Sequence, residues 1–411
     1  TLRGGAVREQ SQEMMGGGRY LSSDDPMRVF ASGAVVDGME LGVRWRSGKR
    51  SVVKGVRANR EYEIDESTAL EAPAEMRATV KPWFREIALG HTHREEPFDD
   101  FGRQPLLPRR LSGLGPGVGW MDVDGDGLDD AVIGGGRGGA MGVFRNTGKG
   151  GFEPLPAVAT ARDQTGLAAL VDGAGRVRIV GGSSNYEDDS NLGGGVEEWI
   201  AGAPGFEKTL GGGWSAVGPV AMGDIDGDGQ VELFVGSRTR AGRYPEVDGS
   251  RVMRRVGTQW QVDAANTAVL QEAGMVSGAV WTDVDGDGRV DLVVATEWGP
   301  LKVYRNRKGT LEASDMGLGK YRGFWNGVTA GDFDGDGRMD LVASNWGTNT
   351  RHGRERMYFG DLGGQGQVEV VESEVEGGRW LPVRDLEVMS RVMPWVREKY
   401  GKHRAYAEAT V

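Results

Sequence analysis

Acidic side chains gather in four short segments of this 411-residue chain, which read MDVDGDGLDD, GDIDGDGQVE, TDVDGDGRVD and GDFDGDGRMD. Each segment has Asp at positions 1, 3 and 5 and Asp or Glu at position 9, counted from its first repeated Asp. Four carboxylates this close repel one another unless a cation neutralises them. The spacing therefore predicts a hard divalent cation, and Ca²⁺ fits best because it accepts about six to eight oxygens in a flexible shell.

One template describes all four predicted Ca²⁺ sites. The side chains at positions 1, 3, 5 and 9 and the backbone carbonyl at position 7 are the predicted ligands, and glycines at positions 4 and 6 allow the chain to wrap tightly. The predicted ligands are Asp122, Asp124, Asp126, Leu128 and Asp130 in the first loop, Asp224, Asp226, Asp228, Gln230 and Glu232 in the second, Asp283, Asp285, Asp287, Arg289 and Asp291 in the third, and Asp332, Asp334, Asp336, Arg338 and Asp340 in the fourth.

The residues after each loop exclude an EF-hand. An EF-hand needs a bidentate Glu at position 12 and a helix on each side, whereas position 12 here is Ile133, Val235, Val294 or Ala343. The following runs AVIGG, LFVGS, LVVAT and LVASN are short and apolar, which predicts buried strands. A single Asp-Gly pair more often makes only a hairpin turn, but the recurrence of all four acids favours metal binding.

The loops mark a repeat. They start at residues 122, 224, 283 and 332, and the segment LVDGAGRVRIVGG from residue 170 fills the double-length first gap, so that successive starts are 48, 54, 59 and 49 residues apart. This length matches one four-stranded propeller blade. The copy at 170 keeps the turn through Asp172 and Gly175, but its ligand positions hold Leu170, Ala174 and Arg178. A weaker match at 361–370 keeps only Asp361 and Glu369 and is not predicted as a site.

The loops at this spacing resemble the FG-GAP/VCBS repeat family, whose blades carry DxDGDGxxD loops and build propellers similar to the integrin α-subunit head. The resemblance covers about 105–380 and implies that the loop residues named above bind calcium in a structural, extracellular role. The segments GGGRYLSSDDPMRVF and WRSGKRSVVKGVRANREYEIDE resemble the ASPIC/UnbV domain, which accompanies FG-GAP repeats in cartilage-acidic-protein-like proteins. Arg46 stands where the usual form of the second motif has Pro.

We therefore expect an all-β fold: a β-propeller of FG-GAP blades with a small N-terminal β domain and a short helical insertion near the C-terminus. The 70 glycines fit many tight turns between short strands. The expected divisions are an ASPIC/UnbV-like β domain at 1–66, a connector at 67–104, the FG-GAP/VCBS blades at 105–380, and a helical insertion or the start of further blades at 381–411. Because the sequence opens at Thr1 and ends inside a helix-like pattern, we expect an internal fragment without its signal peptide.

The connector holds the only cluster of histidines, in the segment HTHREE. His91, His93 and Glu95 could bind a transition metal. Their alternating spacing without a third, remote ligand instead favours a solvated or packed connector, so the sequence predicts no metal site here.

Composition excludes several kinds of site. The chain has no Cys, which excludes disulfides, thiolate metal sites and cysteine nucleophiles, and it has no apolar stretch long enough to span a membrane. Its net charge of -11 and the lack of a basic run with interleaved aromatics argue against nucleic acid. We expect an extracellular, cell-surface or periplasmic binding or adhesion module for a protein or glycan partner, with about four structural Ca²⁺ ions.

The alternative is a polysaccharide lyase or hydrolase on a similar scaffold, which fold alone does not exclude. The sequence shows no GxSxG, HExxH or P-loop, and its four histidines do not suggest an acid–base pair, so we expect no enzymatic activity. Arg238 or Lys302 could hold an acidic sugar, although a solvated surface charge is the simpler interpretation of both.

Overall fold

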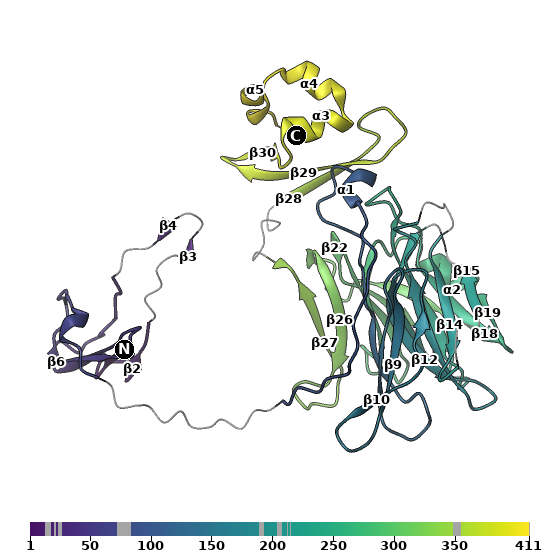
Figure 1. The fold of residues 1–411 in the computed structure, drawn as a ribbon, viewed down its shortest axis with the longest axis horizontal. Helices are drawn as coiled ribbons and strands as arrows, with labels where there is room; N and C mark the ends of the chain where they lie inside the picture. The colour runs from purple at the N-terminus through teal and green to yellow at the C-terminus, as the bar shows by residue number, and fades with distance from the viewer. Residues whose placement is uncertain are drawn as a thin grey trace. The chain divides into compact units, whose positions relative to one another are not determined.

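The computed structural model describes residues 1–12, 18–19, 22–23, 27–71, 84–188, 193–203, 208–211, 213, 215–347 and 355–410 (Figure 1). The chain divides into two compact units, Thr1–Glu86 and Ile87–Val411. The division falls inside the segment expected to be a connector. Strands make up most of the regular structure, which confirms the expected β class, and the helices are short.

The first unit is built on one antiparallel sheet with the strand order β2-β1-β5-β6. The expected hairpin is formed by β5 and β6, which pair antiparallel. In the tight turn between them, Trp45 N–H donates to the Lys49 carbonyl at 2.9 Å. Leu2, Met39 and Val56 form its small buried core. The elements are β1 (Leu2–Arg3), β2 (Glu9–Gln10), β3 (Gly18–Arg19), β4 (Ser22–Ser23), β5 (Met39–Arg44), β6 (Arg50–Val56) and the 3-10 helix η1 (Glu66–Thr68).

Four consecutive sheets of the second unit share one plan, in which each strand pairs antiparallel with the next. This is the four-stranded repeat that the loop spacing predicts. The first sheet contains β7 (Val118–Met121), β8 (Asp130–Ile133), β9 (Ala140–Asn146), β10 (Phe152–Pro154) and the added β11 (Val158–Ala159); the second contains β12 (Gln164–Val171), β13 (Val177–Ser183), β14 (Gly195–Ile200) and β15 (Lys208–Gly211).

The third and fourth sheets repeat the plan, and shorter sheets follow them. The third contains β16 (Ser215–Gly223), β17 (Glu232–Arg240), β18 (Arg251–Val256) and β19 (Gln259–Val262), and the fourth contains β20 (Val276–Thr282), β21 (Asp291–Thr296), β23 (Lys302–Asn306) and β24 (Leu311–Ser314). The remaining strands are the pair β22 (Gly299–Pro300) and β25 (Arg322–Gly323), the fifth sheet β26 (Trp325–Gly331) and β27 (Asp340–Asn345), and the sixth sheet β28 (Glu355–Gly360), β29 (Glu369–Glu376) and β30 (Arg379–Pro382).

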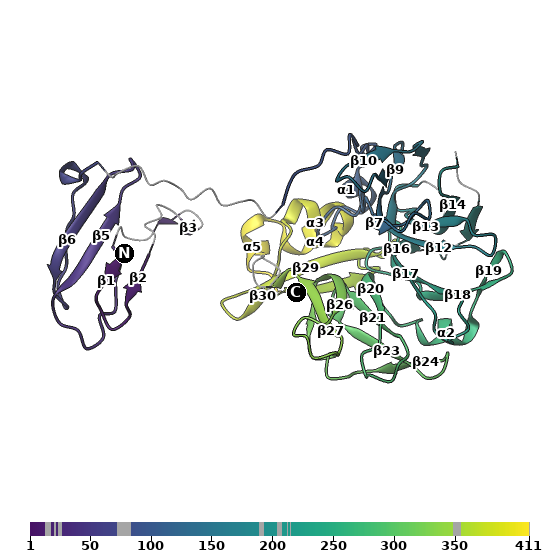
Figure 2. The ribbon, with the colours of Figure 1, turned by 90° about the horizontal axis from the view of Figure 1, so that it is seen from below.

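Neighbouring sheets bury their apolar faces against each other. Along β17 the side chains alternate, so that Leu233 and Val235 pack with the second sheet while Phe234 packs with the fourth. The first strands β7, β12, β16, β20 and β26 contact one another in turn, and Figure 2 shows β16 and β20 near the centre of this unit with β19 and β24 toward its outside. A repeat of this kind cannot bury both faces of its sheet alone, so stacking supplies the core.

The helical segment expected near the C-terminus is present. Helices α3 (Leu386–Val392), α4 (Pro394–Tyr400) and α5 (His403–Ala407) lie over the sixth sheet (Figure 1) and bury Leu386 and Met389 against Val371 of β29. The other helices are α1 (Asp100–Arg103) and α2 (Ala264–Val269). Within the described part of the chain, no helix is both long and apolar enough to cross a bilayer.

Candidate metal centres

Each Asp-rich loop joins the first and second strands of a sheet, and its position-1 carboxylate organises the turn. In the third loop Asp283 Oδ1 accepts hydrogen bonds from Gly286 N–H at 2.8 Å and Asp287 N–H at 3.1 Å, while Oδ2 accepts one from Gly288 N–H at 2.7 Å. The other three loops repeat these bonds. Gly286 and Gly288 have φ of 73° and 84°, which explains why both positions are glycine.

The position-9 acid begins the second strand and is buried in the first three loops. Asp291 Oδ2 accepts a hydrogen bond from Val284 N–H at 3.1 Å and Oδ1 accepts one from Asn306 N–H at 2.7 Å. Burial raises the pKa of Asp291 and of Glu232, and the neighbouring loop acids raise both pKa values further. The folded chain thus places an acid where its negative charge is costly without a compensating cation.

The structure brings together three of the four acids in every loop. Ligand oxygens from positions 1, 3 and 9 lie within 4.8 Å of one another in the first three loops, and those from positions 1, 3 and 5 do so in the fourth. The acids outside these groups are Asp126, Asp228, Asp287 and Asp340. The backbone N–H of each position-7 residue donates a hydrogen bond to the position-5 carboxylate. That the position-7 carbonyls bind a cation stays a prediction.

Arginines already compensate part of the negative charge, and they do so unequally. Arg254 forms an ion pair with Asp226 and lies 3.8 Å from Glu232 in the second loop. Arg305 pairs with Asp285 in the third loop, and the nearest such contact in the first loop is 3.9 Å long. Among the residues that the structure describes, no ion pair reaches the acids of the fourth loop, so a cation that binds there displaces no arginine.

The incomplete copy of the loop at residues 170–178, which we call the worn loop, lies in the second sheet and contains an arginine cation. Its loop keeps the expected turn, since Asp172 Oδ1 accepts hydrogen bonds from Ala174 N–H at 2.9 Å and Arg176 N–H at 3.0 Å. The buried Arg178 guanidinium, at position 9, contacts Asp172 Oδ2 at 2.8 Å and Glu198 Oε1 at 3.1 Å. The Arg176 N–H and both guanidinium groups hold the pKa of Asp172 below its usual range. A side-chain cation therefore stands in this loop.

The loop at 361–369 has the same turn with fewer acids. Asp361 accepts hydrogen bonds from Gln365 N–H at 2.8 Å and Gly366 N–H at 2.9 Å, and the buried Glu369 accepts one from Leu362 N–H at 2.8 Å. Backbone donors thus satisfy both end positions of the template. The middle positions hold no acid.

A further acidic cluster was missed by sequence reasoning. Oxygens of Glu95, Asp163 and Glu187 lie within 4.8 Å of one another, and His93 Nε2 is 2.7 Å from Glu95 Oε1. The sequence signal for this cluster is the HTHREE segment, which contains His93 and Glu95. The other two acids, Asp163 and Glu187, come from two other loops. The other histidine, His91, packs edge-on against Phe144 with ring centroids 5.8 Å apart.

Comparison with known families agrees with the third and fourth Asp-rich loops and with the first unit. The FG-GAP-like repeat family matches residues 283–343, the FG-GAP repeat matches residues 324–368, and the ASPIC and UnbV family matches residues 1–71. The chain carries FG-GAP repeats behind an N-terminal ASPIC/UnbV domain. No curated protein matches the sequence of this FG-GAP repeat protein.

Several solved structures show a partial likeness to this FG-GAP repeat protein. An Agrocybe aegerita lectin that recognises non-reducing terminal N-acetylglucosamine is 19% identical, with 71% of this chain and 69% of that chain covered and a TM-score of 0.32. An exotype rhamnogalacturonan lyase is 16% identical, with 62% and 55% covered and a TM-score of 0.29. A thermostable family-43 glycoside hydrolase is 9% identical, with 67% and 95% covered and a TM-score of 0.32. At these TM-scores the likeness assigns no activity.

The strands β7, β12, β16, β20 and β26 line a hollow of about 500 Å³, which is also lined by Arg109 and Arg238. Both arginines form ion pairs with the buried Glu297. The interpretation of Arg238 as a solvated surface charge is therefore wrong, because the side chain is buried. Lys302 donates a hydrogen bond to the Glu272 carbonyl.

Proposed function

We propose that this FG-GAP repeat protein is a calcium-stabilised module that binds a protein or glycan partner outside the cytoplasm. The repeats that match the FG-GAP family support a binding or scaffold module. Calcium, the location, the class of partner and the absence of catalysis are parts of the proposal. The ions have a structural role in it: they hold the turns between the first and second strands and thereby the neighbouring surface.

The worn loop supports the cation most directly. This loop has no acid at positions 1 and 5, and its position 9 holds Arg178, whose guanidinium contacts Asp172 at position 3. The loops that keep all four acids have no comparable internal cation built into position 9. A divalent ion would supply there the charge that Arg178 supplies in the second sheet.

The kind of ion and the location follow from the ligands. Oxygens from carboxylates and backbone suit Ca²⁺, and extracellular modules bind it with dissociation constants of about 0.1 to 1 mM. Sites that weak fill in calcium-rich surroundings and stay largely empty in a resting cytosol. This reasoning favours a protein that works on the outside of a membrane.

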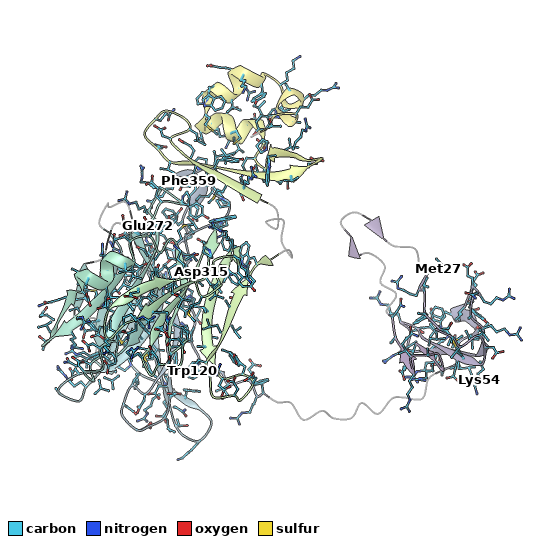
Figure 3. All side chains as sticks on the ribbon, turned by 180° about the vertical axis from the view of Figure 1, so that it is seen from behind. Met27, Lys54, Trp120, Glu272, Asp315 and Phe359 are labelled. Atoms are coloured by element: carbon cyan, nitrogen blue, oxygen red, sulfur yellow. The ribbon has the colours of Figure 1, made fainter. Side chains whose placement is uncertain are left out.

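Exposed aromatic side chains beside the loops support a partner. Trp120, labelled in Figure 3, is 60% exposed two residues before the first loop, and its ring lies 5.9 Å from that of Phe152. Phe333, inside the fourth loop, is 61% exposed. Large exposed aromatics are enriched in interaction surfaces, and a calcium-ordered loop would hold these two in place.

The proposal is tested by counting bound Ca²⁺ with equilibrium dialysis and isothermal titration calorimetry. Asp122→Asn should remove one ion from a total of about four, because it replaces a charged ligand with a neutral amide and removes one of the two oxygens that accept the N–H groups of the turn. Asp129→Asn is the matched control in the same loop, since Asp129 is not a predicted ligand, and should leave the total unchanged. An unchanged ion count in Asp122→Asn, or an equal loss in both variants, would refute the calcium site in this loop.

A second experiment separates binding from catalysis. The protein is screened on glycan and protein arrays in Ca²⁺ and in EGTA, and it is incubated in parallel with anionic polysaccharides. Calcium-dependent capture without cleavage is the expected result. Release of unsaturated or shortened sugars would instead favour a lyase or hydrolase on this scaffold.

A further inference from the structure

Three carboxylates from distant parts of the chain meet in the second unit. Glu95 lies in the segment before α1, Asp163 lies between β11 and β12, and Glu187 follows β13. One oxygen from each lies within 4.8 Å of the others. This cluster belongs to none of the Asp-rich loops, and no DxDGDGxxD pattern contains its members.

Each carboxylate uses one oxygen to bond to the protein and keeps the other unbonded. Asp163 Oδ1 accepts a hydrogen bond from Arg137 N–H at 2.8 Å, Glu187 Oε1 accepts one from Gly113 N–H at 3.1 Å, and Glu95 Oε1 contacts His93 Nε2 at 2.7 Å. The second oxygens, Asp163 Oδ2, Glu187 Oε2 and Glu95 Oε2, are buried and have no hydrogen-bond partner within the described residues.

Burial makes these unbonded oxygens informative. Asp163 is only 2% exposed and Glu187 only 6%, so water does not solvate them freely. A buried carboxylate oxygen without a donor costs free energy and calls for an explanation, such as an ion. Among the described residues, the arginine or lysine that forms an ion pair with this cluster is Arg137, whose Nη1 lies 4.0 Å from Glu187 Oε2 and whose Nε pairs with Glu96 at 3.2 Å. One guanidinium shared with a fourth acid does not balance three carboxylates.

The backbone is shaped to admit the third carboxylate. A Cβ atom on Gly136 would lie 2.4 to 2.5 Å from the carboxyl atoms of Glu95, so only a glycine lets this side chain reach the cluster. Hydrogen bonds hold the same segment, because Glu96 N–H donates to the Arg137 carbonyl at 3.1 Å. The cluster is thus positioned by the chain on both sides of Glu95.

We propose that Glu95, Asp163 and Glu187 bind one divalent cation that prefers oxygen ligands, as a site separate from the Asp-rich loops. Carboxylate oxygens suit Ca²⁺, Mg²⁺ and Mn²⁺. His93 contacts Glu95 Oε1 through its Nε2 atom and so orients the carboxylate, as outer hydrogen-bonding groups commonly do around metal ligands. The ion would tie the segment before α1 to the first and second sheets, and it supplies the remote ligands that the HTHREE segment lacks in the sequence.

Burial also changes the pKa values in this cluster. Burial and the neighbouring acids raise the pKa of Asp163 to about 6 and the pKa of Glu187 to about 7. Without a cation, protons would therefore compete for these groups near neutral pH.

The test counts bound Mn²⁺ by electron paramagnetic resonance on the full chain at pH 7.5, with Ca²⁺ and Mg²⁺ competition to identify the preferred ion. The double variant Asp163→Asn/Glu187→Gln should bind one ion fewer than the unchanged protein. Glu96→Gln is the matched control, because it removes an adjacent acid that pairs with the same Arg137. An unchanged ion count in the double variant, or an equal loss in the control, overturns the proposal and leaves a shared proton as the explanation.

Gly136→Ala keeps all three acids and displaces only the Glu95 carboxylate. It should weaken the site about tenfold or more, in line with other changes around metal ligands, while circular dichroism stays unchanged. Full affinity in this variant would contradict the geometry. The difference in ion count does not depend on the Asp-rich loops: if those loops fail to bind calcium, the unchanged chain should still bind one ion and the double variant none.

Discussion

Removal of calcium should lower the melting temperature of the second unit substantially. A ligand that binds only the folded chain stabilises it by RT ln(1 + [L]/Kd), so a site with a Kd of about 0.1 mM in about 2 mM Ca²⁺ contributes about 1.8 kcal/mol. Four such loops would contribute about 7 kcal/mol. At about 2 °C per kcal/mol for a unit of this size, chelation should lower the melting temperature by roughly 14 °C.

The structure predicts that the four loops contribute unequally to this calcium-dependent change in melting temperature. Arg254 and Arg305 occupy acids of the second and third loops, so a cation entering there must displace an existing ion pair. The fourth loop has no such ion pair among the described residues. Asp332→Asn should therefore remove at least an even share of the calcium effect, about 4 °C by the same conversion, whereas Asp226→Asn should remove less.

The assay is a thermal melt followed by circular dichroism in 2 mM CaCl₂ and again in excess EGTA, with MgCl₂ as a control. Mg²⁺ should restore only part of the loss, because it prefers a stricter octahedral shell and retains water. An unchanged melting temperature in EGTA would refute the reasoning, since it would show that the clustered acids tolerate one another without an ion. Equal rescue by Mg²⁺ would refute the choice of Ca²⁺.

Other predictions test the cation in the worn loop, the acidic cluster and the last loop. Arg178→Gln leaves Glu198 buried without its closest cation, and urea unfolding should show a loss of about 3 kcal/mol that is the same in Ca²⁺ and EGTA. The raised pKa values of Asp163 and Glu187 stabilise the metal-free fold at low pH; this contribution is lost as pH rises through about 6 to 7, so in EGTA the melting temperature should fall from pH 5 to pH 8 relative to the double variant. Gly363→Asp should destabilise the chain without creating a calcium site, because its Cβ would lie 2.7 Å from the carbonyl of the last residue of α3; tighter Ca²⁺ binding would contradict this.

The loops could be predicted because all their information is local. Asp283 and Asp291 are eight residues apart, and the glycines between them have the positive φ that the tight turn requires. The strands on each side follow directly from the apolar runs. The spacing of loops then predicts one sheet per repeat, and four sheets with four consecutive strands confirm it.

The acidic cluster could not be predicted because its members meet only through packing. The sequence shows His93 and Glu95 together, but nothing in it indicates that the loops with Asp163 and Glu187 face the same segment. The same limit applies to Arg178. In the sequence Arg178 only lacks the ligand type expected at position 9, and the contact with Glu198 on β14 shows that its guanidinium compensates a buried acid.

One physical problem explains the variation among the loops. In the first three Asp-rich loops and in the loop at 361–369, the acid at position 9 is buried where the second strand begins, so its charge must be balanced. Four loops gather further acids, which a divalent ion could join, and the worn loop substitutes Arg178. In the last loop Glu369 accepts the N–H bond from position 2, here Leu362, that the position-9 acids of the Asp-rich loops also accept, and it accepts a further bond from Gly363. There Trp395 of α4 donates to the Leu362 carbonyl at 3.1 Å, so that turn supports the C-terminal helices.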